Sequence, residues 1–178
     1  MTEKLWQELR VAAQKVTEEE PLLSNYVYAC VLDHKSLASS LSFILANKLS
    51  DEVMPAVTVR ELFDTAFLDS PEIIDNAACD IKAVFERDAA INSFLAVILY
   101  TKGFHAIEVH RLAHYLWTHG RVELALFIQS RNSEVFSVDI HPACVIGKGI
   151  MFDHATGIVI GETTVIEDNV SILQQVTL

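Results

Sequence analysis

The sequence predicts an α+β protein in which an N-terminal α-helical bundle, residues 1–136, precedes the first coils of a left-handed parallel β-helix, residues 137–178. Two observations carry this prediction. Up to about residue 135, apolar residues recur at intervals of three and four, the spacing of an amphipathic helix. From Val138 onward an aliphatic residue returns at every sixth position, a period that suits neither a helix nor a flat strand.

The first part of the chain divides into six or seven predicted helices. A spacing such as Leu41, Ile44 and Leu45 gives one apolar face. Ser70 and Pro71 predict a helix start, with the serine as N-cap and the proline as the first helical residue. Residues that end or separate helices lie near Pro21, Ser50 and Asp51, Arg87 and Asp88, residues 101–103, and Gly120.

Two of the helical segments, residues 94–100 and 122–128, are apolar around more than half of the helix circumference. One small helical layer would not cover so much apolar surface. We therefore expect contacts between subunits to bury the remainder, which predicts a homo-oligomer.

The six-residue repeat predicts a triangular solenoid. Ile140 and Ile146 set its phase, and the repeat resumes at Ile160, Ile166, Ile172 and Leu178. Each hexad would form one short face of a coil and point its aliphatic residue toward a shared axis. Because one hexad cannot bury that residue alone, successive coils must stack.

The repeat is interrupted once, between Ile146 and Ile160. These residues are fourteen positions apart, two more than a pair of hexads, and the interruption spans residues 151–157. An irregularity in a regular β-structure often marks a functional surface. We therefore expect a working site in this segment.

Composition excludes several classes of partner. Thirteen basic against 24 acidic residues give a net charge of -11, which repels the phosphates of nucleic acid and anionic lipid. The longest apolar run, residues 94–100, is far shorter than the ~20 residues of a membrane span. Residues 1–10 lack the pattern of a signal peptide. We expect a cytoplasmic protein that binds neither nucleic acid nor membrane.

The candidate chemistry lies in the hexad region. His154 falls within the interruption, and Asp139 lies at the start of the repeat. A carboxylate that holds an imidazole can fix its tautomer and stabilise the protonated ring, and a histidine can take a proton from a hydroxyl group near neutral pH. The two residues could therefore form a general base with its orienting carboxylate, or a plain surface pair.

Other residues allow alternative interpretations. Cys144, with His141 nearby, could be an acyl-accepting nucleophile, although its position in the repeat favours packing. His110 and His114 have a spacing that can bind zinc, but no third ligand accompanies them, and the three cysteines show no CxxC pair. Asp88 could be the N-cap of the helix that follows it. We predict no metal site and no disulfide.

The segment VDIHPACVIGKGIMFDHATGIVIGETTVIEDNVSILQQVTL resembles the start of the β-helix of bacterial serine acetyltransferases, and SLSFILANKLS and KGFHAIEVHRLAHYLW resemble the helical domain of that family. The resemblance covers essentially the whole chain. It implies transfer of the acetyl group of acetyl-CoA, as co-substrate, to the hydroxyl of L-serine, which gives O-acetyl-L-serine for cysteine biosynthesis. It implies no prosthetic group, and L-cysteine as a feedback inhibitor at the serine site.

The same resemblance assigns roles to individual residues. His154 in DHATG matches the family's catalytic base, and Asp139 in VDIHP matches its orienting carboxylate. Asp153 and Asp88 match positions that hold the ammonium group of the amino acid. The family has a proline after the latter position where this chain has Ala89, which puts the rigidity of that loop in doubt.

The resemblance also implies an assembly. Members of the family form trimers through their β-helices and dimers of trimers through their helical domains, and they bind O-acetylserine sulfhydrylase through a C-terminal tail. The family continues past the position of Leu178 with an Arg-His pair for the substrate carboxylate and with coils that bind CoA. We therefore expect this chain to be a fragment with little acetyltransferase activity.

Three alternatives remain open at the level of sequence. The protein could be a hexapeptide-repeat acyltransferase that uses the same base on another acceptor. It could be a non-catalytic module that only assembles trimers or hexamers. It could resemble the hexapeptide-repeat carbonic anhydrases, whose zinc is held by histidines between subunits. These coils contain only His141 and His154 as possible ligands, and a third suitable histidine is missing.

Overall fold

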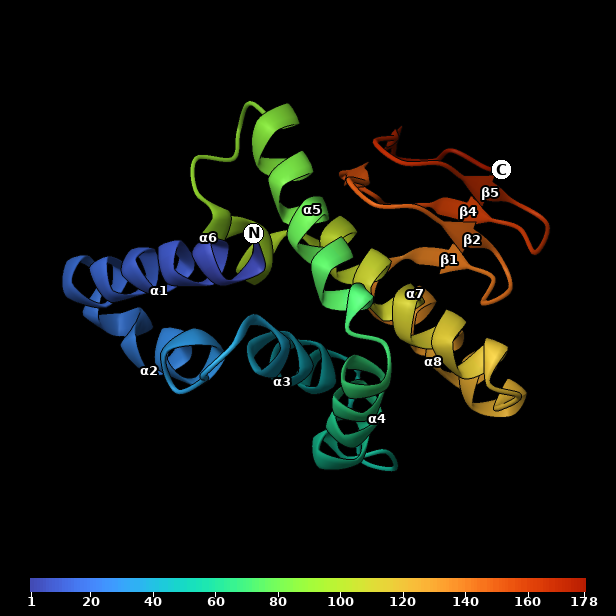
Figure 1. Ribbon diagram of the computed structural model, residues 1–178, viewed down its shortest axis with the longest axis horizontal. Coiled ribbons are helices and arrows are strands. Elements are labelled where there is room, and N and C mark those ends of the chain that lie inside the picture. The colour runs from blue at the N-terminus through green and yellow to red at the C-terminus, as the bar shows by residue number, and fades with distance from the viewer.

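A computed structural model describes all 178 residues of the chain. Figure 1 shows the strands gathered at one end of the molecule beside α7, with α1 to α4 on the other side. The helices are α1 (Thr2–Glu19), α2 (Ser24–Val27), α3 (Leu37–Leu49), α4 (Ala56–Asp69), α5 (Glu72–Arg87), α6 (Phe94–Tyr100), α7 (Lys102–Thr118) and α8 (Val122–Phe136), with a 3-10 turn at Pro21–Leu23 and a π-helical turn at Tyr28–Leu32. The strands are β1 (Val138–Ile140), β2 (Val145–Ile146), β3 (Met151–Asp153), β4 (Ile158–Ile160), β5 (Val165–Ile166) and β6 (Ser171–Leu173).

Each predicted helix break is present, but the break at residues 33–36 was not predicted and two details were wrong. There are eight α-helices rather than six or seven, because the short α2 and its neighbouring turns form separate elements. Ser70 is not the N-cap of α5. It ends α4, and Pro71 occupies the N-cap position, because helical geometry in α5 starts only at Glu72.

The strands form the start of a left-handed parallel β-helix, as predicted. They pair in parallel as β1 with β4, β2 with β5 and β3 with β6. In the first coil Val138 pairs with Ile158, and the other two strand pairs have the same offset along the chain. Farther along, Val159 pairs with Thr177, which follows it by three hexads. This offset is two positions shorter than the offset between Val138 and Ile158. The first coil therefore contains two extra residues, as the interrupted repeat predicts.

One continuous apolar core runs through the helices and the coils. It contains the repeat positions Ile140, Ile160, Ile166 and Ile172, which are at most 6% exposed. Helix α7 is buried over nearly its whole length, because it lies between the other helices and the coils. Its contact with the first coil fixes where the irregular part of the β-helix can lie.

The apolar surplus expected on two helices is small on both. On α6, residues 95 and 97–99 are buried and Phe94 is half-buried, whereas Tyr100 remains 58% exposed. On α8, Val122 and Leu126 remain 40% and 37% exposed. The homo-oligomer stays a prediction. No helix of the chain has both the length and the apolar composition that crossing a membrane requires.

A buried ionic cluster joins the helices to the first coil. The guanidinium group of Arg111 on α7 donates to the Asp80 carboxylate and to the Gly147 carbonyl, the latter at 2.8 Å, and its Nε lies 3.5 Å from Glu108. Asp80, fully buried on α5, accepts in addition from the backbone N–H of Ile150 at 2.7 Å. Burial raises the pKa of Glu108 well above its usual range. Asp80 and Arg111 are thus the charged pair that ties α5 and α7 to the coil.

Candidate active site

The two extra residues of the first coil form a strained corner. His154 and Ala155 have φ angles of 57° and 64°, in the left-handed region, and we call residues 153–156 the irregular corner. Ala155 N–H donates to the Asp153 carbonyl at 2.6 Å, and Thr156 N–H donates to the His154 carbonyl at 2.8 Å. Such conformations cost about 1 kcal/mol or more for each non-glycine residue, and they persist only where the surrounding structure imposes them. Residues 151–153 form the regular strand β3, so the interruption begins after that strand and not at the predicted Met151.

The corner projects the His154 side chain out of the coil. The imidazole is 77% exposed, whereas the neighbouring Ala155 is fully buried and anchors the corner in the core. The Asp153 carboxylate lies 3.8 Å from Nε2 of His154. The left-handed backbone conformation thus directs the His154 side chain away from an otherwise regular coil.

A cavity of about 230 Å³ lies in front of this corner. Its lining comes from three segments: Val84 and Asp88 at the end of α5, residues 100–104 at the start of α7, and residues 151–154. Three of the four residues proposed from sequence, namely Asp88, Asp153 and His154, therefore meet at one cavity although the first lies far from the other two along the chain. Two carboxylates and an imidazole around a small cavity suit a ligand with a cationic group and a hydroxyl.

Asp88 serves its own loop as well as the cavity. Its carboxylate accepts from the backbone N–H of Ala90 at 2.9 Å, and its carbonyl accepts from Ile91 at 3.1 Å. It does not cap the following helix, because Ser93 is the N-cap of α6 and accepts from Ala96 at 3.1 Å. The N-cap interpretation was wrong. The carboxylate and carbonyl of Asp88 thus close a short turn that contains Ala89.

Asp139, the fourth proposed residue, does not line the cavity. Its carboxylate accepts a hydrogen bond of 2.8 Å from the Gln129 side chain on α8, and no hydrogen bond joins it to His154. Its strand β1 pairs with β4, the strand that leaves the irregular corner at Ile158. Asp139 therefore lies beside the strand that follows the corner, and its carboxylate contacts the helical part.

Sequence reasoning missed the contribution of α7 to this site. Lys102 and Gly103 begin that helix and line the cavity. A Cβ atom on Gly103 would collide with the carbonyl oxygen of Phe152, two residues before His154. The helix can approach β3 so closely because this residue is glycine. The Lys-Gly pair at a predicted helix start was the available signal, but nothing in the sequence showed that it faces the corner.

The alternative nucleophile fits the structure poorly. Cys144 is fully buried, and this burial raises the pKa of its thiol to about 12. Its sulfur lies 3.7 Å from Nε2 of His110 rather than next to His141, whose Nδ1 accepts from Ala143. A thiol held in the protonated form and sealed in the core cannot attack a thioester, so Cys144 is a packing residue.

His110 and His114 likewise have neighbours other than a metal. His114 Nδ1 bonds to the Pro142 carbonyl at 2.8 Å. His110 is 2% exposed, and burial lowers its pKa to about 3, so it is neutral. Both side chains connect α7 to the turn between β1 and β2.

The buried His110 predicts an acid-sensitive fold. Its pKa is about 3 in the folded chain and about 6.5 when unfolded, so between these pH values the unfolded chain binds one proton more. The free energy of unfolding therefore falls as the pH drops below about 6.5. His110→Gln should reduce that dependence by about 1.4 kcal/mol per pH unit between pH 4 and 6. Urea unfolding at several pH values measures it, with His119→Gln on the exposed end of α7 as control. An unchanged slope in His110→Gln would contradict the prediction.

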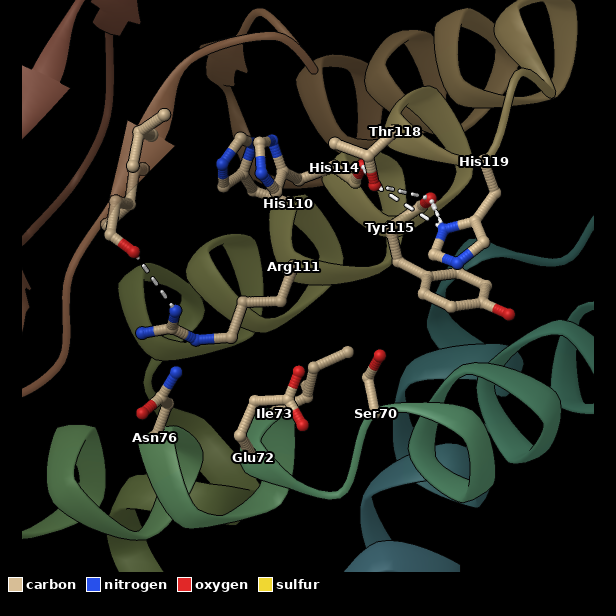
Figure 2. A pocket seen from close by; sticks show the side chains of 12 residues that line it. Ser70, Glu72, Ile73, Asn76, His110, Arg111, His114, Tyr115, Thr118 and His119 are labelled. Atoms are coloured by element: carbon tan, nitrogen blue, oxygen red, sulfur yellow. Dashed lines mark hydrogen bonds between the residues drawn. The ribbon is translucent and has the colours of Figure 1, made fainter.

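A second cavity, of about 330 Å³, lies between α5, α7 and β2 (Figure 2). Its labelled side chains come from the start of α5 and one face of α7, and Arg111 extends along its wall toward the Ile146 carbonyl. His119 and Tyr115 are hydrogen-bonded to their own helix or to Asp69. None of the four residues proposed from sequence lines this cavity. It belongs to the junction of helices and coil.

Comparison with known proteins gives one consistent result. Residues 5–109 match the family model described as "Serine acetyltransferase, N-terminal". The serine acetyltransferase of Haemophilus influenzae is 52% identical over all 178 residues, and this chain covers 67% of its length. That of Escherichia coli K12 is 51% identical over 176 residues, which are 99% of this chain and 64% of the relative. The chain thus spans about two thirds of the length of these relatives.

Solved structures agree with the sequence comparison. A serine acetyltransferase in complex with cysteine superposes with a TM-score of 0.98 at 52% identity, over the whole of this chain and 74% of the other. One in complex with CoA gives a TM-score of 0.99 at 52% identity, over the whole of this chain and 76% of the other. The Neisseria gonorrhoeae enzyme in complex with serine gives 0.96 at 44% identity, over 98% of this chain and 72% of the other.

Proposed function

The chain belongs to the serine acetyltransferase family, and from this premise we propose that the protein transfers the acetyl group of acetyl-CoA to the hydroxyl of L-serine. The products are O-acetyl-L-serine, a precursor of cysteine, and free CoA. The observation that carries the proposal is the cavity in which His154 meets Asp88 and Asp153. Complexes of relatives with serine and with CoA support the choice of both substrates.

In the proposed reaction His154 is the general base. Its imidazole takes the proton of the serine hydroxyl while that oxygen attacks the thioester carbonyl of acetyl-CoA. The carbon–sulfur bond then breaks, and the imidazolium returns the proton to the departing CoA sulfur. No acyl-enzyme forms, which agrees with the buried and protonated state of Cys144. The exposure of His154 on its corner leaves room for both substrates.

The carboxylates have separate roles in the proposal. Asp88 and Asp153 hold the ammonium group of serine, because both line the cavity and no cationic side chain of the chain pairs with Asp88. Asp139 orients the imidazole. Support for the role of Asp139 comes from the family resemblance alone, since its carboxylate lies against Gln129.

The proposal extends to regulation and assembly. L-cysteine, which resembles serine in all but one atom, competes for the same carboxylates, and the complex of a relative with cysteine supports this. The exposed apolar residues of α8 support a homo-oligomer, which we propose to be a trimer or a dimer of trimers. We further propose O-acetylserine sulfhydrylase as a partner, on the resemblance alone.

The test is release of the CoA thiol by the full-length protein, supplied with acetyl-CoA and with L-serine, D-serine, L-threonine or no acceptor. We expect release that depends on L-serine and that L-cysteine suppresses. Release with another acceptor in preference to L-serine would indicate a different acyltransferase. No release with any acceptor would indicate an assembly module, and either result would contradict the proposal.

A further inference from the structure

Backbone hydrogen bonds within the coil hold the irregular corner, among them that from Gln175 N–H to the Thr156 carbonyl at 3.0 Å. His154 and Ala155 both adopt left-handed backbone conformations, and two short turns bridge them. The His154 imidazole is largely exposed and has no hydrogen-bond partner that would hold it. Contacts from outside the coil therefore add to the hydrogen bonds and the buried Ala155 that fix this strained conformation.

Lys102 supplies one contact from outside. Its ammonium group donates to the hydroxyl of Thr156, the last residue of the irregular corner. Thr156 also donates its backbone N–H to the His154 carbonyl. The path from the lysine to the base is thus one side-chain hydrogen bond followed by one backbone hydrogen bond.

The position of Lys102 in its helix is otherwise unfavourable. It is the first residue of α7, where the aligned peptide dipoles favour an acidic side chain and disfavour a cation. It forms no ion pair, although Asp88 and Asp153 line the same cavity. Its ammonium therefore leaves both carboxylates available to a ligand. Its one side-chain partner is the hydroxyl of the irregular corner.

Gly103 fixes the distance between the lysine and the corner. The absence of a side chain lets the first turn of α7 touch the Phe152 carbonyl, and Phe152 is itself buried. The start of α7 therefore packs directly against strand β3, and three residues beyond that strand Thr156 accepts the hydrogen bond of Lys102.

We propose that Lys102 is a positioning residue for His154: by holding the Thr156 hydroxyl, it keeps the irregular corner in the conformation that turns the imidazole toward the cavity. The proposal rests on the proposed function in one respect, that His154 is the base. In this proposal Lys102, which lines the cavity, acts through Thr156 and not by contact with the transferred group.

The kinetic test uses the full-length protein with Lys102→Met, Thr156→Val and the double variant. Each single change should lower kcat by about 10- to 100-fold, the effect of a slightly misplaced catalytic group, and leave the KM for serine nearly unchanged. Because both changes break the same hydrogen bond, the double variant should be no slower than the slower single variant. Lys102→Arg and Thr156→Ser, which keep a donor and a hydroxyl, should recover most of the rate.

Three results would overturn the proposal: a normal kcat in Thr156→Val, losses that multiply in the double variant, or a raised KM with unchanged kcat in Lys102→Met. A second measurement does not depend on the reaction. Amide hydrogen exchange at residues 154–157 should accelerate in both single variants, with equal exchange elsewhere as evidence of intact folding. If the parent protein transfers no acetyl group, the proposed function fails. Unchanged amide exchange at residues 154–157 in the variants overturns only the proposed role of Lys102.

Discussion

Replacing His154 by alanine in the full-length protein is expected to lower turnover by about two to four powers of ten, the usual contribution of a general base. The imidazole is 77% exposed, so its removal should leave the free energy of unfolding almost unchanged. Measurement of CoA release at saturating serine and acetyl-CoA separates the loss of the base from any loss of binding.

The backbone at this position calls for a second variant. His154 has a φ of 57°, and asparagine tolerates the left-handed region better than alanine does. His154→Asn should therefore lose as much activity as His154→Ala while keeping the corner intact. His119→Gln, at the far end of α7, is the matched control and should retain parental turnover. Near-parental activity in either His154 variant would contradict the assignment of the base.

Arg111→Met is expected to lower the free energy of unfolding by about 3–5 kcal/mol, because it leaves the buried carboxylate of Asp80 without its cation. The Arg111 side chain is 6% exposed and that of Asp80 is fully buried, so water cannot replace the lost partner. The same change removes the donor to the Gly147 carbonyl and should loosen the junction of α7 with the first coil. Urea unfolding at fixed protein concentration measures the effect.

A surface pair provides the control for this prediction. Arg60 lies 3.7 Å from Asp64, one turn away on α4, and both side chains are at least 36% exposed. Exposed pairs of this kind contribute about 0–1 kcal/mol, so Arg60→Met should change stability little. Equal losses in Arg111→Met and Arg60→Met would show that the buried cluster has no special role at the junction.

The β-helix could be predicted from sequence because its signal is local and periodic. A single aliphatic residue per hexad, repeated from Ile140, defines the axis of the coil, and an excess of two residues reveals a corner. The structure confirms both features, because the pairing offset of the first coil exceeds the three hexads that separate Val159 from Thr177. Most helix ends were predictable for the same reason, since turn residues such as Gly120 act within a few positions.

The composition of the site could be predicted only in part. Asp88 was assigned through the family resemblance, because no local pattern links the end of α5 to a corner that lies so much later in the chain. Where α7 lies against the coils decides the roles of Lys102, Gly103 and the cluster around Arg111. No short motif in the sequence encodes that position of α7. The contact of Asp139 with Gln129 joins the consecutive elements α8 and β1, and it was not foreseen either.

The central claim is that the irregular corner presents an imidazole to the hydroxyl of serine. A crystal structure of the full-length protein with L-serine tests it most directly. We predict the serine oxygen within about 2.6–3.2 Å of a ring nitrogen of His154, with the ammonium group against Asp88 and Asp153. Serine bound in the cavity between α5 and α7, or bound with its hydroxyl turned away from His154, would contradict the claim.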